Sequence, residues 1–149
     1  MRTEHQNKIL LDYIWQLKSE LWLVDWTLVL SEESPSGEDT IAMVEPIIGR
    51  KRATIYLCSD FCDMSAKKQT HSLVHELIHL HHIPATDIIR LDVAKDLSQS
   101  TYDLLWSVFK RQMEYCVDGL ADAFSRLVKE IDYTERSIES SETANDNQA

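Results

Sequence analysis

A chain of 149 residues with 44% hydrophobic and 27% charged side chains suits one globular domain. Its formal net charge of −10 argues against a nucleic-acid partner, because an acidic surface repels phosphate groups. No stretch is apolar and long enough for a membrane span, and the N-terminus lacks the pattern of a secretory signal, so we expect a cytoplasmic protein that does not bind membranes.

The first third of the chain predicts a helix, a strand and a loop. In residues 4–20, apolar side chains recur at helical spacing along one side, which indicates an amphipathic helix. Residues 24–30 are rich in β-branched and aromatic side chains and therefore favour a strand. The segment 31–39 consists of Ser, Glu, Pro, Gly and Asp, so we expect a loop there.

The middle of the chain predicts a hairpin followed by a helix. Residues 40–48 and 53–58 have the composition of strands, and the segment 49–52 supplies the turn between them. A helix is expected over residues 66–82. Pro84 should end that helix, because the residue before a proline avoids the helical conformation.

The second half of the chain predicts a weak helical segment, a long helix and a tail. The weak segment covers residues 86–97. Ser100 with Asp103 resembles a capping box, after which we expect a helix to about residue 131. The polar and acidic residues 134–149 predict a disordered tail. The apolar ridge of the long helix steps by four and three residues through Met113, Val117, Leu120, Phe124 and Leu127.

This order of elements predicts an α+β fold for a single domain that covers residues 1–133. We expect a small antiparallel sheet of about three strands, packed on the helix over residues 66–82 and on the long C-terminal helix. The odd count of three cysteines argues against a disulfide framework, and Cys58 and Cys62 are expected to be buried free thiols.

The segment His75-Glu76-Leu77-Ile78-His79 carries the strongest chemical signal in the sequence. Residues four apart lie on the same face of a helix, so the two imidazoles can bind one cation, and zinc accepts neutral imidazole nitrogen. Glu76 is rotated by about 100° around the helix axis, where it can accept a proton from a water molecule that zinc acidifies. The spacing predicts two ligands and a general base. A helix that is His-rich by chance is the competing interpretation.

Two histidines and a water leave one ligand position to fill, and four downstream acids are candidates. Glu114 is our choice, because it lies beside the apolar ridge of the predicted long helix and can face inward. Asp118 is one turn later and could accept the second ring N–H of a ligating histidine. Asp122 also suits a solvated acidic face, and Glu130 is less suitable because it lies near the predicted helix end.

Three further histidines have weaker claims to the metal. His71 is four residues before His75, but Ser72 stands where a base is needed. His81 and His82 are expected to cap the C-terminus of the predicted helix, where a positive charge is favourable.

With these residues, the chain resembles the zincin metallopeptidases, and most of all the gluzincin branch, in which a helix bearing HExxH is followed by a glutamate ligand on a later helix. The nearest resemblance is to ImmA/IrrE-like peptidases, which are small and often encoded by phages or mobile elements. The matching segments are residues 53–57, 70–79 and 114–124, and only the HExxH part is specific.

The resemblance implies a zincin-like fold in which His75, His79 and Glu114 bind zinc and Glu76 activates water. Asp118 would be the aspartate that some gluzincins place one turn after the ligand glutamate. The chain departs from the pattern at Ile78, where many relatives have glycine, and by an extra segment around residues 86–100.

The function that follows is zinc-dependent hydrolysis of a peptide bond in a protein or peptide substrate. Two alternatives stay open at this point. The first is a non-catalytic binding or regulatory protein, such as a phage or mobile-element interaction module, that keeps the zincin fold and acts through its acidic surface. The second is a zinc hydrolase that acts on another amide or on an ester.

Overall fold

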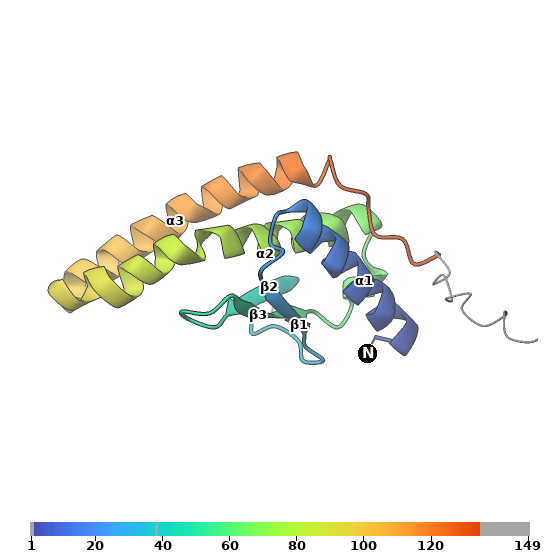
Figure 1. Ribbon diagram of the computed structural model, residues 1–149, viewed down its shortest axis with the longest axis horizontal. Coiled ribbons are helices and arrows are strands. Elements are labelled where there is room, and N and C mark those ends of the chain that lie inside the picture. Colours follow the sequence, from blue (N-terminus) through green and yellow to red (C-terminus); the bar gives the residue numbers. More distant parts are fainter. Residues whose placement is uncertain (1, 38, 135–149) are drawn as a thin grey trace, which may run out of the picture.

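The computed structural model describes residues 2–37 and 39–134 and has an α+β architecture (Figure 1). None of the described helices is apolar over a sufficient length to cross a lipid bilayer. Apart from Thr134, the tail predicted over residues 134–149 lies outside the described residues. The α-helices and strands follow the order α1 (Glu4–Glu20), β1 (Thr27–Leu30), β2 (Ala42–Pro46), β3 (Arg52–Leu57), α2 (Ala66–Asp87) and α3 (Gln99–Phe124).

The three strands form one mixed sheet in the order β1-β3-β2. β2 pairs antiparallel with β3 from Ala42 opposite Leu57 to Pro46 opposite Ala53, which confirms the predicted hairpin. β1 pairs parallel with β3, so the expectation of a purely antiparallel sheet is wrong. After β1 the chain forms β2 at the far edge of the sheet. It then returns, so that β3 lies between β2 and β1.

The core lies between the sheet and the helices α1 and α2, and Figure 1 shows α2 extending across the sheet. Alternate residues of β3 face this core, and Ala53, Ile55 and Leu57 are at most 1% exposed. This packing fixes α2, the helix that carries the HExxH motif, against the sheet. The helices contribute buried side chains at helical spacing, among them Leu10, Ile14, Leu17, Leu73, Leu77 and Leu80.

The first helix has the predicted bounds, and the cysteines are free. α1 begins with a capping box in which Thr3 and Gln6 bond each other's backbone N–H groups, so its start is determined locally. The described cysteines form no disulfide, as expected. Cys58 and Cys62 are half-buried, and Cys116 is exposed on α3.

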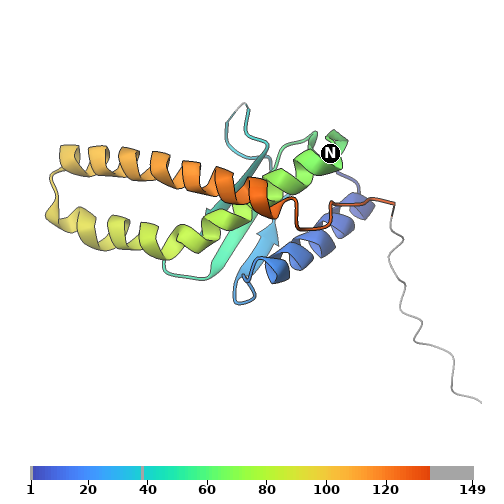
Figure 2. The ribbon, with the colours of Figure 1, turned by 90° about the horizontal axis from the view of Figure 1, so that it is seen from above.

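α2 continues through Pro84 to Asp87, so the prediction that proline ends this helix is wrong. An interior proline removes one helical hydrogen bond and costs about 3 kcal/mol. On either side of Pro84, however, Ile83 packs against the core and Thr86 is buried, and this tertiary packing outweighs the local cost. Figure 2 shows the axis of α2 bending in its second half, as a helical proline predicts. The weak helical segment predicted over residues 86–97 is helical, but it begins with the last residues of α2 and continues as a π-helical turn at Ile88–Asp92 and a 3₁₀ turn at Val93–Asp96.

α3 starts earlier and ends earlier than predicted. Its N-cap is Ser98, whose Oγ accepts a hydrogen bond of 3.3 Å from the backbone N–H of Thr101, so the predicted capping box of Ser100 and Asp103 is wrong. The helix ends at Phe124 rather than near residue 131, because the following segment turns back to the core. There the backbone N–H of Ile131 donates to Thr70 Oγ1 at 3.1 Å.

The face of α3 that packs on α2 is narrower than the predicted ridge. Val117 and Ala121 are buried, and Met113 packs against the core from the same side, at steps of four residues. A helix with a single helical neighbour buries only such a stripe. The remaining residues of the predicted ridge are exposed, namely Leu120, Phe124 and Leu127.

Candidate metal centre

Three donor atoms converge between α2 and α3, which lie alongside each other in both ribbon views (Figure 1, Figure 2). Nε2 of His75 lies 3.1 Å from Nε2 of His79, and Oε2 of Glu114 lies 3.6 Å and 3.5 Å from these two nitrogens, respectively. α2 supplies both imidazoles, because residues four apart share a helix face. The structure thus brings together the three residues that the sequence predicts as ligands.

The spacing of these atoms suits a zinc ion. A circle through the three atoms has a radius of about 2.0 Å, and zinc binds nitrogen and oxygen ligands at about 2.0–2.2 Å. His75, His79 and Glu114 would hold such an ion and leave a coordination position for a water molecule or a substrate. Two imidazoles and one carboxylate are also donors that zinc prefers, so the residues fit the ion in spacing and in donor type.

Glu76 lies beside the same two histidines, and a carboxylate oxygen of Glu76 is within 4.8 Å of a ring nitrogen of each. Its Oε2 accepts a hydrogen bond of 2.8 Å from the backbone N–H of Val44 in β2. Glu114 has no such bond to the sheet, and its oxygen is almost equally far from both imidazoles. Glu114 therefore suits the third ligand position better, and Glu76 suits the adjacent position predicted for a general base.

Burial perturbs the protonation of the groups at this centre. Loss of hydration raises the pKa of Glu76 from 4.5 to about 7, with a smaller contribution from the negative charge of Glu114, while the Val44 N–H opposes the shift. Burial also lowers the pKa of His79. A lowered pKa favours the neutral imidazole, which is the form that binds a metal.

Asp118 makes the contact predicted for a residue that orients a ligand. Its Oδ1 lies 3.2 Å from Nδ1 of His75, on the side of the ring away from Glu114. A donor N–H at Nδ1 leaves a lone pair on Nε2, so this carboxylate selects the tautomer that a metal requires.

His71 and Asp122 form the next contact along the same two helices, with Nε2 of His71 3.0 Å from Oδ1 of Asp122. The contacts between α2 and α3 follow one register. Each step of four residues forward on α2, from His71 to His75 to His79, corresponds to a step of four residues back on α3. The partners on α3 are Asp122, Asp118 and Glu114. Asp122 is paired with His71, and its side chain is also 67% exposed, as expected for an acid on a solvated face. Glu130, the last candidate ligand, lies beyond the end of α3 and is not brought to the centre.

His81 and His82 do not cap the C-terminus of α2, because the helix continues past them to Asp87. Nε2 of His81 instead lies 2.8 Å from the backbone carbonyl of Leu21, where α1 ends. Nδ1 of His82 lies 3.3 Å from the carbonyl of Ile78 within its own helix. Neither ring contributes to the candidate centre.

The centre opens into a groove. A hollow of about 550 Å³ lies between β2, α2 and α3, with His75, Glu76, His79 and Glu114 in its wall. A smaller hollow of about 220 Å³, lined by His71 among others, adjoins it and shares Ala42, His75 and Glu76. A substrate lying along the groove would therefore extend to both sides of the donor atoms.

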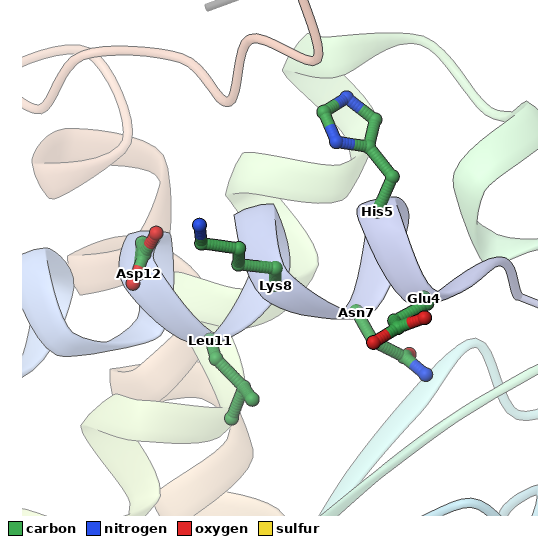
Figure 3. A pocket seen from close by; sticks show the side chains of 6 residues that line it. All are labelled: Glu4, His5, Asn7, Lys8, Leu11 and Asp12. Atoms are coloured by element: carbon green, nitrogen blue, oxygen red, sulfur yellow. The ribbon is translucent and has the colours of Figure 1, made fainter. Parts of the chain in front are cut away.

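Another hollow, of about 610 Å³, lies on the outer surface of α1, and its lining residues include His5, Lys8 and Asp12 (Figure 3). All of its lining residues belong to one helix. Figure 3 shows the side chains of His5 and Leu11 pointing in opposite directions, so the polar groups do not converge on a ligand. The groove at the α2–α3 centre is thus the better candidate for a functional site.

Two features of the site have no signal in the sequence pattern. The hydrogen bond from Val44 to Glu76 depends on the position of β2 at the edge of the sheet. The far wall of the groove, with Arg90, Trp106 and Lys110, depends on how α3 folds back on α2.

Comparisons of this chain with models of protein families, with curated proteins and with solved structures found no match. A functional assignment therefore depends on the residues and the geometry of the site.

Proposed function

We propose that this protein is a zinc-dependent metallopeptidase of the zincin type, with His75, His79 and Glu114 as zinc ligands and Glu76 as the general base. The proposal depends on one observation above all. Two imidazole nitrogens and one carboxylate oxygen from separate helices lie 3.1–3.6 Å apart, at the spacing of ligands around one zinc ion.

Zinc held there would supply Lewis acidity and lower the pKa of a water molecule toward 7. Glu76 is placed to act on such a water, because the Val44 N–H holds Oε2 and leaves Oε1 without a hydrogen bond to the described residues. Oε1 can accept the proton of the attacking water and pass it to the nitrogen of the departing amine. In the metal-free protein, burial raises the pKa of this carboxyl to about 7. The positive charge of a bound zinc would lower that pKa and favour the carboxylate, which is the form that accepts a proton.

The groove supports a peptide as the substrate. β2 pairs only with β3 within the sheet, so its other edge faces the groove with backbone groups that an extended chain can pair with. Two residues of β2 cannot donate to such a chain, since the Val44 N–H is bonded to Glu76 and Pro46 has no backbone N–H. An extended substrate beside β2 would bring its backbone carbonyl groups past the donor atoms.

The test is cleavage of a mixed peptide pool by the full chain, followed by mass spectrometry, with metal content measured on the same samples. We expect one zinc per chain, cleavage that chelation abolishes and zinc restores, and a Glu76→Gln variant that keeps its zinc but loses at least 10²-fold in rate. Glu130→Gln removes a carboxylate outside the centre and is the matched control. Equal cleavage rates of wild type and Glu76→Gln would contradict the assignment of the general base.

A further inference from the structure

We propose that the substrate carries a carboxylate group, bound by Arg90 and Lys110 two to four residues from the bond that is cleaved. This inference rests on the proposed function, because it names a substrate class for the same groove. It concerns the wall farthest from the motif, which the HExxH pattern does not describe.

Two cations face the same hollow from different elements. Arg90 comes from the turn that follows α2, Lys110 comes from α3, and both line the hollow that also holds His79 and Glu114. The chain carries a net charge of −10, so two cations on one wall of the groove run against its overall acidity. The acids of the hollow are Glu76 and Glu114, which lie at the candidate centre, where the charge of a bound zinc would offset them.

Neither cation has an acidic partner among the described residues. The structure records the surface pairs Lys51 with Asp25 and Lys95 with Asp92, but no ion pair or hydrogen bond for Arg90 or Lys110. Both recorded pairs are exposed and lie outside the groove. The two in the groove keep their hydrogen-bond donors available for a ligand.

An aromatic row holds the arginine in place. Cζ of Arg90 lies 5.8 Å from the centre of the Trp106 ring, and Trp106 is stacked on Tyr102 and Phe109 with ring centres 6.3 Å and 5.8 Å away. A cation–π contact favours this position of the guanidinium without using its N–H groups. Arg90 is therefore prepared to bind a planar carboxylate through two parallel hydrogen bonds.

The distance along α3 predicts where the carboxylate lies in the substrate. Lys110 precedes Glu114 by four residues and Trp106 precedes it by eight, which corresponds to about 6 Å and 12 Å along the helix axis. An extended peptide advances about 3.3 Å per residue. For a substrate that continues from β2 along α3, a carboxylate between these positions is about two to four residues from the scissile bond.

The carboxylate can belong to a Glu or Asp side chain or to the C-terminus of the substrate. Both sources offer the same planar anion to Arg90 and Lys110. Three series of fluorescently labelled decapeptides of Ala, Ser and Phe separate them. The first carries a Glu pair moved along the chain and has blocked ends, the second has Gln in place of Glu, and the third has Gln with a free C-terminus.

Binding is measured by fluorescence anisotropy on the full-length Glu76→Gln protein loaded with zinc, and cleavage of the same peptides is measured with wild type. We expect at least one carboxylate-bearing series to bind about five- to thirtyfold more tightly than the blocked Gln series. Raising the salt concentration to 0.5 M should reduce the difference. Arg90→Glu with Lys110→Glu, made in the same background, should abolish it.

Lys67→Glu with Arg111→Glu is the control pair, since it makes the same change in net charge at exposed positions outside the groove. Equal affinity for all three series, no measurable binding, or an equal loss in the control pair would overturn the inference. Cleavage reports on the proposed function separately. Cleavage without a preference for carboxylate contradicts only this inference, and carboxylate-dependent binding without cleavage contradicts only the peptidase.

Discussion

His75 and Asp118 face each other across the two long helices, with 3.2 Å between ring Nδ1 and carboxylate Oδ1. The contact orients the imidazole whose other nitrogen lies at the candidate centre. It follows the same register of α2 against α3 as the contacts of His71 with Asp122 and of His79 with Glu114.

Removal of this carboxylate should weaken metal binding without removing a ligand. We expect Asp118→Ala to lower zinc affinity about 10–100-fold, because His75 loses the group that selects its tautomer and orientation. Competition titration with a zinc-binding dye measures the affinity. Asp122→Ala is the control, since it removes an equivalent partner from His71 one turn farther along α3. Equal affinities of Asp118→Ala and wild type would argue against the orienting role.

The protonation of Glu76 should be visible in the stability of the metal-free protein. A carboxyl whose folded pKa is raised stabilises the fold fully below its unfolded pKa, and that stabilisation is lost as the pH rises through the folded pKa. For Glu76 this window runs from 4.5 to about 7.

In chelator, wild type should therefore lose stability relative to Glu76→Gln between pH 4.5 and pH 8, by on the order of 1–3 kcal/mol. Gln keeps an oxygen that can accept the Val44 hydrogen bond, so the comparison isolates the charge. Urea denaturation at several pH values measures the difference. A difference that is constant across this range would show that the carboxyl is not perturbed.

Trp22 should be destabilising at its position. It follows the last turn of α1 with a φ of 56° and 84% of its surface exposed, in a turn where Trp22 N bonds Ser19 O and Leu23 N bonds Lys18 O. Helices usually place glycine at this left-handed position, since other residues pay about 1 kcal/mol or more for it.

We expect Trp22→Gly to raise the free energy of unfolding by about 1 kcal/mol. Ser19→Gly is the control of opposite sign, because glycine within α1 should lower stability by about 0.5 kcal/mol. Chemical denaturation reports both changes. A loss of stability in Trp22→Gly would mean that the indole makes a favourable contribution that outweighs the backbone strain.

Local patterns account for the parts of the fold that the sequence predicts well. The spacing of apolar side chains gives the bounds of α1, and the turn residues between β2 and β3 identify the hairpin. The parallel pairing of β1 with β3 cannot be predicted from local patterns, because it depends on the path of the chain between β1 and β2 rather than on any residue within β1. The local preference of Pro84 to end a helix also fails as a predictor, because tertiary packing keeps α2 helical to Asp87.

The candidate site divides in the same way. His75 and His79 can be recognised from their spacing alone, since a helix places them on one face. Glu114 follows from the expectation that α3 turns an acid inward. The Val44 N–H that holds Glu76 and the cations of the far wall depend on contacts between elements distant in sequence, which no periodicity reveals.

The most direct test of the central claim is X-ray absorption at the zinc edge on the full-length protein after zinc repletion, for wild type and for Glu114→Ala. We predict two imidazole nitrogens and one carboxylate oxygen at about 2.0–2.2 Å in wild type, with the protein oxygen lost in Glu114→Ala. Zinc surrounded only by solvent oxygens, or an unchanged spectrum in Glu114→Ala, would contradict the three-residue centre.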